Sequence, residues 1–156
     1  LVIPGHLIDA HSAPNAKKQA TTFAKETQEV ERRAVEAALA AERALGRVPE
    51  EMPRNNPGFD IRSTDPADPL AHRYYLEVKG RIAGSNTFTI TNSEINFAQN
   101  HKDTHRLVLV SVHPDGPEFD EVRYVTHAFD DMEASMSTHS RNEKWSHYWG
   151  QGGAPV

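Results

Sequence analysis

The alternation of apolar and polar residues predicts strands through the middle of the chain. Residues 58–61 and 73–81 alternate with a period of two, as strands with one buried face do. Residues 87–91 alternate in the same way, and 106–113 contain a continuous apolar run typical of a buried central strand. A weaker pattern over 121–126 indicates an edge strand. The middle of the chain is therefore expected to form a sheet.

Helical patterns precede this sheet and interrupt it. Residues 16–45 are rich in Ala, Glu, Lys, Arg and Gln and contain neither Pro nor Gly. A narrow apolar stripe recurs there every three or four residues: Phe23, Val30, Ala34, Ala37 or Ala38, Ala41 and Leu45. Gly46 suits the left-handed position that ends a helix. A second helix is expected over 92–100. Helices flanking a mixed sheet define an α/β fold.

The 156 residues suffice for one sizeable domain and are short for two. We expect a leader or linker from a preceding region over 1–15, the folded domain over 16–128 and a polar C-terminal extension over 129–156. A first residue Leu rather than Met suggests a piece of a longer protein. The absence of cysteine excludes disulfides and thiolate metal sites, and fits the cytoplasmic location that we expect. No apolar run approaches the ~20 residues of a membrane span, so no membrane partner is expected.

The polar faces of the first two strands carry candidate catalytic residues. With Phe59 and Ile61 expected to face the core, Asp60 projects from the other face. Glu77 and Lys79 project together from the second strand, opposite its apolar residues. If the strands pair, two carboxylates and an ammonium converge. This set suits a metal-dependent phosphodiesterase, because carboxylates bind Mg²⁺ and the bound ion polarises a phosphoryl oxygen and acidifies a water.

Each of these residues also has a simpler interpretation. Asp60 is compatible with a turn in which its side chain bonds backbone amides. Glu77 and Lys79 are compatible with an exposed ion pair worth less than about 1 kcal/mol. Trp145 to Trp149 could stack on bases, but docking of the C-terminal segment onto the domain is the favoured interpretation. No histidine spacing indicates a zinc site.

Asp60 and Glu77-Val78-Lys79 resemble the PD-(D/E)xK nuclease superfamily. Five motifs, over roughly residues 25 to 126, also run in the order expected of a NO VEIN-type C-terminal domain: Glu42–Arg47, Gly58–Ser63, Leu76–Arg81, Thr89–Glu94 and Arg123–Val125. That domain is similar to restriction-endonuclease folds and often ends bacterial helicase-like proteins, including defence-associated ones. The resemblance implies a restriction-endonuclease-like mixed sheet flanked by helices, acting on DNA beside a helicase-like region of the same or a companion chain.

The resemblance also implies roles for individual residues. Asp60, Glu77 and the Val78 backbone carbonyl would hold Mg²⁺ or Mn²⁺, and Lys79 would position the attacking water. The superfamily adds an acidic residue from the first helix, for which Glu36 is favoured by its spacing to Gly46 and Glu42 by the closer family motif.

The start of the second helix supplies two further candidates. Glu94 has two open interpretations: it could complete a capping box with Thr91 at the N-cap, or it could belong to the site. Asn92 is a weaker candidate for the site.

The net charge of −5 argues against strong autonomous DNA binding, because such domains carry basic stripes. A metal would offset part of the acidity, and a tether to a helicase would raise the effective concentration. We therefore expect a Mg²⁺-dependent DNA endonuclease or the nuclease module of a helicase-linked system. The alternative is a catalytically inactive nuclease-fold module that binds nucleic acid or protein.

Overall fold

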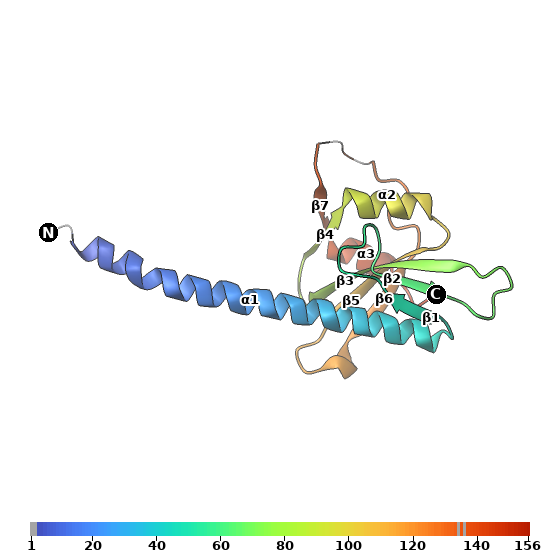
Figure 1. The fold of residues 1–156 in the computed structure, drawn as a ribbon, viewed down its shortest axis with the longest axis horizontal. Coiled ribbons are helices and arrows are strands. Elements are labelled where there is room, and N and C mark those ends of the chain that lie inside the picture. The colour runs from blue at the N-terminus through green and yellow to red at the C-terminus, as the bar shows by residue number, and fades with distance from the viewer. Residues whose placement is uncertain (1–2, 134, 136) are drawn as a thin grey trace.

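The computed structural model has an α/β architecture. It describes residues 3–133, 135 and 137–156, without the side chains of residues 3–14 and 20–24. The elements are α1 (Ile3–Ala44), β1 (Val48–Glu51), β2 (Ile61–Thr64), β3 (Arg73–Ile82), β4 (Thr87–Thr91), α2 (Asn92–Asn100), β5 (His105–Val112), the 3-10 turn η1 (Pro117–Phe119), β6 (Glu121–Val125), β7 (Ser140–Lys144) and α3 (Trp145–Gln151). Figure 1 shows the C-terminal half of α1 lying across the sheet.

The main sheet has five strands in the order β1-β2-β3-β5-β6. Neighbours pair antiparallel except β3 and β5, which are parallel. The mixed sheet flanked by helices is the fold class that the sequence predicts. The register of β2 with β3 ends where Ile61 lies opposite Leu76, whereas β3 continues to Ile82. Among the described residues, the second half of β3 therefore has no strand neighbour on the β2 side.

One face of this sheet packs against α1. The buried residues of this layer come from α1 and from alternate positions of the strands: Ala34, Ala38, Leu39, Ile61, Leu76, Val108, Val110, Val112 and Tyr124. A Cβ atom on Gly80 of β3 would lie 2.5 Å from the Ala34 Cβ. The missing side chain lets α1 approach β3 closely, which fixes the helix against this part of the strand.

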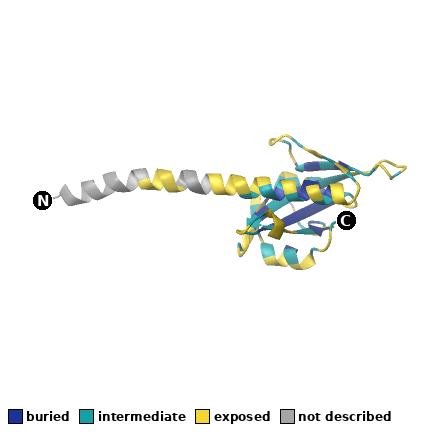
Figure 2. Ribbon diagram, turned by 90° about the horizontal axis from the view of Figure 1, so that it is seen from below, coloured by how far each residue is buried: buried dark blue, intermediate teal, exposed yellow. Residues whose placement is uncertain are grey.

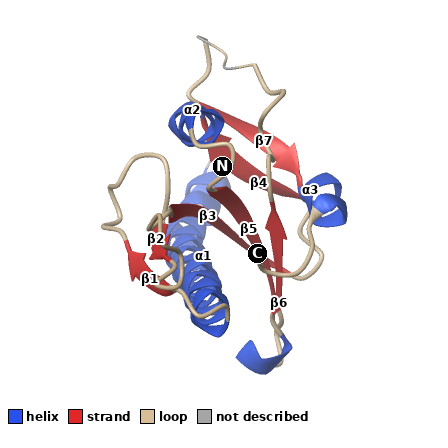
Figure 3. Ribbon diagram, turned by 90° about the vertical axis from the view of Figure 1, so that its right-hand side faces the viewer, coloured by secondary structure: helices blue, strands red, loops and turns tan. Residues whose placement is uncertain are grey.

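The opposite face packs against a second layer, the two-stranded sheet β4-β7 together with α2 and α3 (Figure 3). Phe88 and Ile90 of β4 are buried there, and Tyr148 of α3 is buried beside them, with Trp145 and Trp149 packed against the same cluster. The favoured docking of the aromatic C-terminal segment is confirmed. β5 lies between the two layers and is buried over nearly its whole length, as the dark ribbon in Figure 2 shows.

Several boundaries differ from those that the sequence predicts. The first helix begins at Ile3 rather than Ala16, so residues 3–15 are not extended. Pro14 has no backbone N–H and so cannot donate the usual helical hydrogen bond. The helix continues through it because adding turns to an existing helix needs no new nucleation. Gly46 has the expected positive φ of 80°. Leu45 is exposed rather than part of the packed stripe, and Phe23 lies outside the described side chains.

Two segments form strands although the alternation of apolar and polar residues in them is weak or absent. Residues 48–51, whose pattern is weak, form β1 at the sheet edge. The polar residues 140–144 form β7, which pairs with β4 along its length. Its sequence, Ser-Arg-Asn-Glu-Lys, has no apolar alternation, so its pairing with β4 rather than its own pattern makes it a strand.

Candidate active site at the edge of β3

Asp60 is tied to β3 through both its backbone and its side chain. It stands immediately before β2, where its N–H donates to the Leu76 carbonyl at 2.8 Å. The Val78 N–H in turn donates to the Asp60 Oδ2 at 2.7 Å. These bonds occupy the edge of β3 where its pairing with β2 has just ended. The structure therefore places the Asp60 carboxylate beside the strand that carries Glu77 and Lys79.

The turn before Asp60 depends on an unusual glycine. Gly58 has φ +96°, and a Cβ there would lie 2.8 Å from the Phe97 Cβ. Phe59 packs its ring against Tyr75 at 4.9 Å and against Phe97 at 4.8 Å. The expectation that Phe59 shares the Ile61 side is therefore wrong, because the chain turns at Asp60 and sends Phe59 to the face of Tyr75 and Glu77. The aromatic contacts hold the approach to Asp60 against α2.

Lys79 lies between two carboxylates from different elements. Its Nζ is 2.7 Å from the Glu77 Oε1 and 3.1 Å from the Glu94 Oε2. That same Glu94 oxygen accepts the Thr91 N–H at 2.9 Å, and the Glu94 N–H donates to the Thr91 hydroxyl at 3.2 Å. Glu94 thus completes the capping box of α2 and contacts Lys79 at the same time. The two interpretations of Glu94 are compatible rather than exclusive.

Burial and mutual repulsion shift the pKa of the carboxyl groups upward. Burial raises the pKa of Asp60, against the bond from Val78 and the charge of Lys79. The pKa of Glu77 lies well above its ordinary value because Glu77 is almost completely buried, with Asp60 and Glu94 adding to the rise. Because the charge of Asp60 acts on Glu77, the two carboxyls lie near each other.

The pKa of Lys79 shows which charges dominate around it. Burial lowers it, but the attraction of Glu77 and Glu94 outweighs burial and leaves the pKa above its ordinary value. Lys79 therefore stays charged among three carboxyl groups. Burial is the main reason that the pKa values of Asp60 and Glu77 are raised, and the positive charge of Lys79 opposes the rise.

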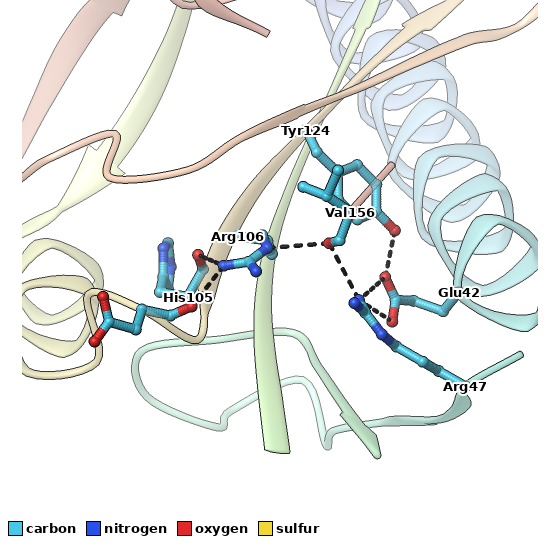
Figure 4. Close-up of polar contacts among 7 residues, drawn as sticks. Glu42, Arg47, His105, Arg106, Tyr124 and Val156 are labelled. Atoms are coloured by element: carbon cyan, nitrogen blue, oxygen red, sulfur yellow. Dashed lines mark hydrogen bonds and ion pairs between the residues drawn. The ribbon is translucent and has the colours of Figure 1, made fainter. Parts of the chain in front are cut away.

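The structure does not bring the first-helix candidates to this cluster. Glu36 is exposed and pairs with Arg32 at 3.1 Å. Glu42 is fully buried on the α1 side of the sheet, where it accepts the Tyr124 hydroxyl at 2.6 Å and pairs with Arg47 at 3.3 Å (Figure 4). Burial, followed by the bond to Glu42, raises the pKa of Tyr124. Since Glu77 and Lys79 project from the other face, neither glutamate contacts them.

Asn92 is likewise engaged elsewhere. Its Nδ2 donates to the carbonyls of Ser135 and Thr138, so it anchors the segment that leads into β7. Its buried Oδ1 has no partner among the described residues. The structure therefore gives Asn92 a role in holding this segment at the start of α2 rather than in the Asp60–Glu77–Lys79 cluster.

A groove of about 670 Å³ runs along the unpaired part of β3 and reaches Lys79. One wall is the α1 surface that carries Glu26, Val30 and Glu31, and the other is the outward face of β4 with Thr87 and Thr89. The sequence pattern places Val30 in the apolar stripe of the helix but gives no functional role to Glu26, Glu31, Thr87 or Thr89. The signal was present in β4, where the threonines alternate with the buried Phe88 and Ile90, but the α1 wall depends on how the helix crosses β3.

No group of three or more His, Cys, Asp or Glu side chains arranged to hold a metal ion occurs in the described part of the chain. The oxygen donors at the β3 edge are the carboxyls of Asp60 and Glu77 and the main chain. None of the helices within the described residues is long and apolar enough to cross a membrane.

These observations define an α/β domain with a buried carboxylate–lysine cluster at the free edge of its central sheet. The family model of the C-terminal domain of Protein NO VEIN matches residues 30–125, more than half of the chain. The chain belongs to this family. The match ends before β7 and α3, which complete the second layer. Neither the comparison with curated proteins nor that with solved structures found a match.

Proposed function

We propose that this domain is a metal-dependent nuclease of the PD-(D/E)xK type, acting on DNA. The observation that carries the proposal is the bond from the Val78 N–H to Asp60, which places the Asp60 carboxylate beside the Glu77–Lys79 pair at the edge of β3. The order Asp, then Glu-x-Lys on the next strand, is the motif of that superfamily. The expected partners are DNA and a helicase-like region.

The donors in this cluster suit a hard divalent cation. Two carboxylates are enough for Mg²⁺, which keeps several of its waters. Burial raises the pKa of both Asp60 and Glu77 and so disfavours their charged forms, a cost that a divalent cation would offset. Val78 points its N–H toward Asp60, and the carbonyl of a strand residue projects to the same side as its N–H. Asp60, Glu77 and the Val78 carbonyl would therefore hold Mg²⁺ or Mn²⁺.

Each residue then has a distinct task in phosphodiester hydrolysis. Bound Mg²⁺ or Mn²⁺ supplies Lewis acidity and a water of lowered pKa. Lys79 presents its ammonium beside the carboxylates, where it orients the attacking water or stabilises the charge that develops on phosphate. Glu94 and Glu77 keep the Lys79 ammonium charged and in place. Asp60 is positioned by the Gly58 turn and the Val78 N–H.

One observation favours the alternative, a catalytically inactive nuclease-fold module that binds nucleic acid or protein. Glu77 is paired with Lys79 at 2.7 Å and almost completely buried, so its carboxyl already has a charged partner without a metal. A cluster of this kind could serve only to stabilise the fold. The two functions differ in whether Asp60 and Glu77 take up a divalent cation.

The test compares the chain with Asp60→Asn and Lys79→Met on single- and double-stranded DNA, with Mg²⁺ or Mn²⁺. Lys102→Met is a matched control at an exposed lysine. We expect metal-dependent cleavage that each of the two site substitutions lowers at least about a hundredfold and that the control preserves. Calorimetric titration with Mn²⁺ should show binding that Asp60→Asn removes. Absence of both cleavage and metal binding in the folded chain would leave the inactive module as the better account.

A further inference from the structure

The groove beside Lys79 is built at a free strand edge. Its floor is β3 from Val78 to Ile82, beyond the last residue paired with β2. α1 closes one side, held close by the contact of Gly80 with Ala34, and β4 closes the other. Because Lys79 lines the groove, a polymer bound there would reach the candidate site.

The β4 wall carries groups that recognise a sugar–phosphate backbone. Thr87 and Thr89 project from the outward face of β4, two residues and about 6.8 Å apart. Arg81 lies beneath them, with its Nε bonded to the Thr87 carbonyl at 2.9 Å. Hydroxyls and guanidinium groups are the side chains that most often contact phosphate and sugar. The Thr89 hydroxyl already donates to Asn142 Oδ1 at 2.8 Å, and Arg81 Nη1 donates to the Gly80 carbonyl. The donors that this wall offers to phosphates are therefore the Thr87 hydroxyl and Arg81 Nη2.

The α1 wall has the opposite character. Glu26 and Glu31 are exposed carboxylates on the helix surface that faces the groove, with Val30 between them. Carboxylates repel phosphates but accept hydrogen bonds from amino groups at base edges, as Glu and Asp do from cytosine N4. A strand whose phosphates lie on β4 would thus turn its bases toward α1.

A peptide strand fits the groove less well. Adding a strand to β3 requires free main-chain groups along its edge. The Gly80 carbonyl already accepts Arg81 Nη1 at 2.7 Å, the Ile82 carbonyl accepts the Ser85 N–H at 3.1 Å, and the Val78 N–H donates to Asp60. Three of the edge groups are therefore occupied within the domain.

We infer that the groove binds an unpaired nucleic-acid strand, with the backbone along β4 and base amino groups at Glu26 and Glu31. The inference rests on the proposed function only in taking nucleic acid as the ligand. It adds a prediction about specificity: unpaired strands rich in cytosine bind more tightly than thymine strands, because thymine has no exocyclic amino group. A duplex binds more weakly, because its bases cannot reach the α1 wall.

The test is fluorescence anisotropy with labelled oligo(dC), oligo(dT) and a mixed duplex, at low salt with EDTA present. The wild-type chain should prefer oligo(dC) over oligo(dT) by roughly threefold to tenfold, as one or two hydrogen bonds allow. The double substitution Glu26→Gln with Glu31→Gln should reduce that preference, because an amide oxygen accepts more weakly than a carboxylate, and should tighten the binding of oligo(dT), because phosphate repulsion falls. Glu121→Gln, at an exposed glutamate of β6, is the control and should leave both affinities unchanged.

The β4 wall is tested separately. The double substitution Thr87→Val with Thr89→Val should lower the affinity for both oligonucleotides roughly tenfold. Thr126→Val, at an exposed threonine outside the groove lining, should leave both affinities unchanged. Equal binding of oligo(dC) and oligo(dT), preference for the duplex, or binding that neither double substitution alters would overturn the inference. Displacement of the oligonucleotide by an extended peptide would overturn it in favour of strand addition.

These outcomes are independent of the proposed chemistry. EDTA removes divalent ions, so the binding assay does not depend on catalysis. Oligonucleotide binding without cleavage in the metal assay would support the proposed binding groove and refute the proposed nuclease activity. Conversely, cleavage that requires Asp60 and Lys79 but is unchanged by the groove substitutions would support the nuclease activity and refute the proposed binding groove. The two proposals therefore fail separately.

Discussion

Glu94 joins two contacts through one oxygen atom, and two substitutions can separate them. Its Oε2 accepts the Thr91 N–H at 2.9 Å and lies 3.1 Å from the Lys79 Nζ. Glutamine at this position of a helix can still complete a capping box, but it carries no charge. Alanine can do neither. Glu94→Gln therefore removes only the ion pair, whereas Glu94→Ala removes the ion pair and the cap together.

The expected magnitudes follow from the burial of each partner. Loss of a capping contact costs about 1 kcal/mol. Loss of a charged hydrogen bond costs about 1.5–3 kcal/mol, and we take about 1 kcal/mol here because Lys79 keeps Glu77 as a partner and the Glu94 side chain is 17% exposed. Glu94→Gln should thus lower the free energy of unfolding by about 1 kcal/mol and Glu94→Ala by about 2 kcal/mol.

Urea unfolding followed by circular dichroism measures both values. Thr91→Ala should cost about 1 kcal/mol on its own. Glu36→Gln is the matched control, since this exposed glutamate makes only a surface pair with Arg32, and it should change stability by less than about 0.5 kcal/mol. If Glu94→Gln proved as unstable as Glu94→Ala, or if neither differed from the wild type, the dual role of Glu94 would be refuted.

Two further predictions concern Gly58 and the buried His105. Gly58→Ala should lower the free energy of unfolding by about 2–4 kcal/mol, because of the strain at φ +96° and the collision with Phe97. Gly46→Ala, at φ +80° but with nothing within 4 Å of the new Cβ, should lower it by only about 1–2 kcal/mol. Thermal denaturation of both variants measures the difference, and equal losses of stability would contradict the contact with Phe97. His105 is 2% exposed, and burial lowers its pKa from 6.5 to about 4, so the unfolded chain binds the proton more readily. The contribution of neutral His105 to the free energy of unfolding is complete above pH 6.5. It is lost as the pH drops toward 4, by about 3 kcal/mol in all. Urea unfolding at pH 7.5 and pH 4.5 should show His105→Leu losing much less stability than the wild type, and parallel losses would contradict the assignment.

The sequence determined the features that depend on the period of a single element. Alternation in β3 placed Glu77 and Lys79 on one face and Leu76 on the other, as the structure has them. The capping box at the start of α2 and the left-handed Gly46 also follow from local backbone chemistry, because a cap joins residues only three positions apart.

The tertiary structure decided which elements meet. The sequence weakly favours Glu36 over Glu42 as the first-helix residue of the site, but the packing of α1 against the opposite face of the sheet removes both from the cluster. Glu94 reaches Lys79 because β4 turns directly into α2 beside β3. The early end of β2 leaves the edge of β3 open for Asp60 and for the groove. A sequence period fixes which side chains share a face, whereas register, strand length and helix placement come from long-range packing that no local pattern encodes.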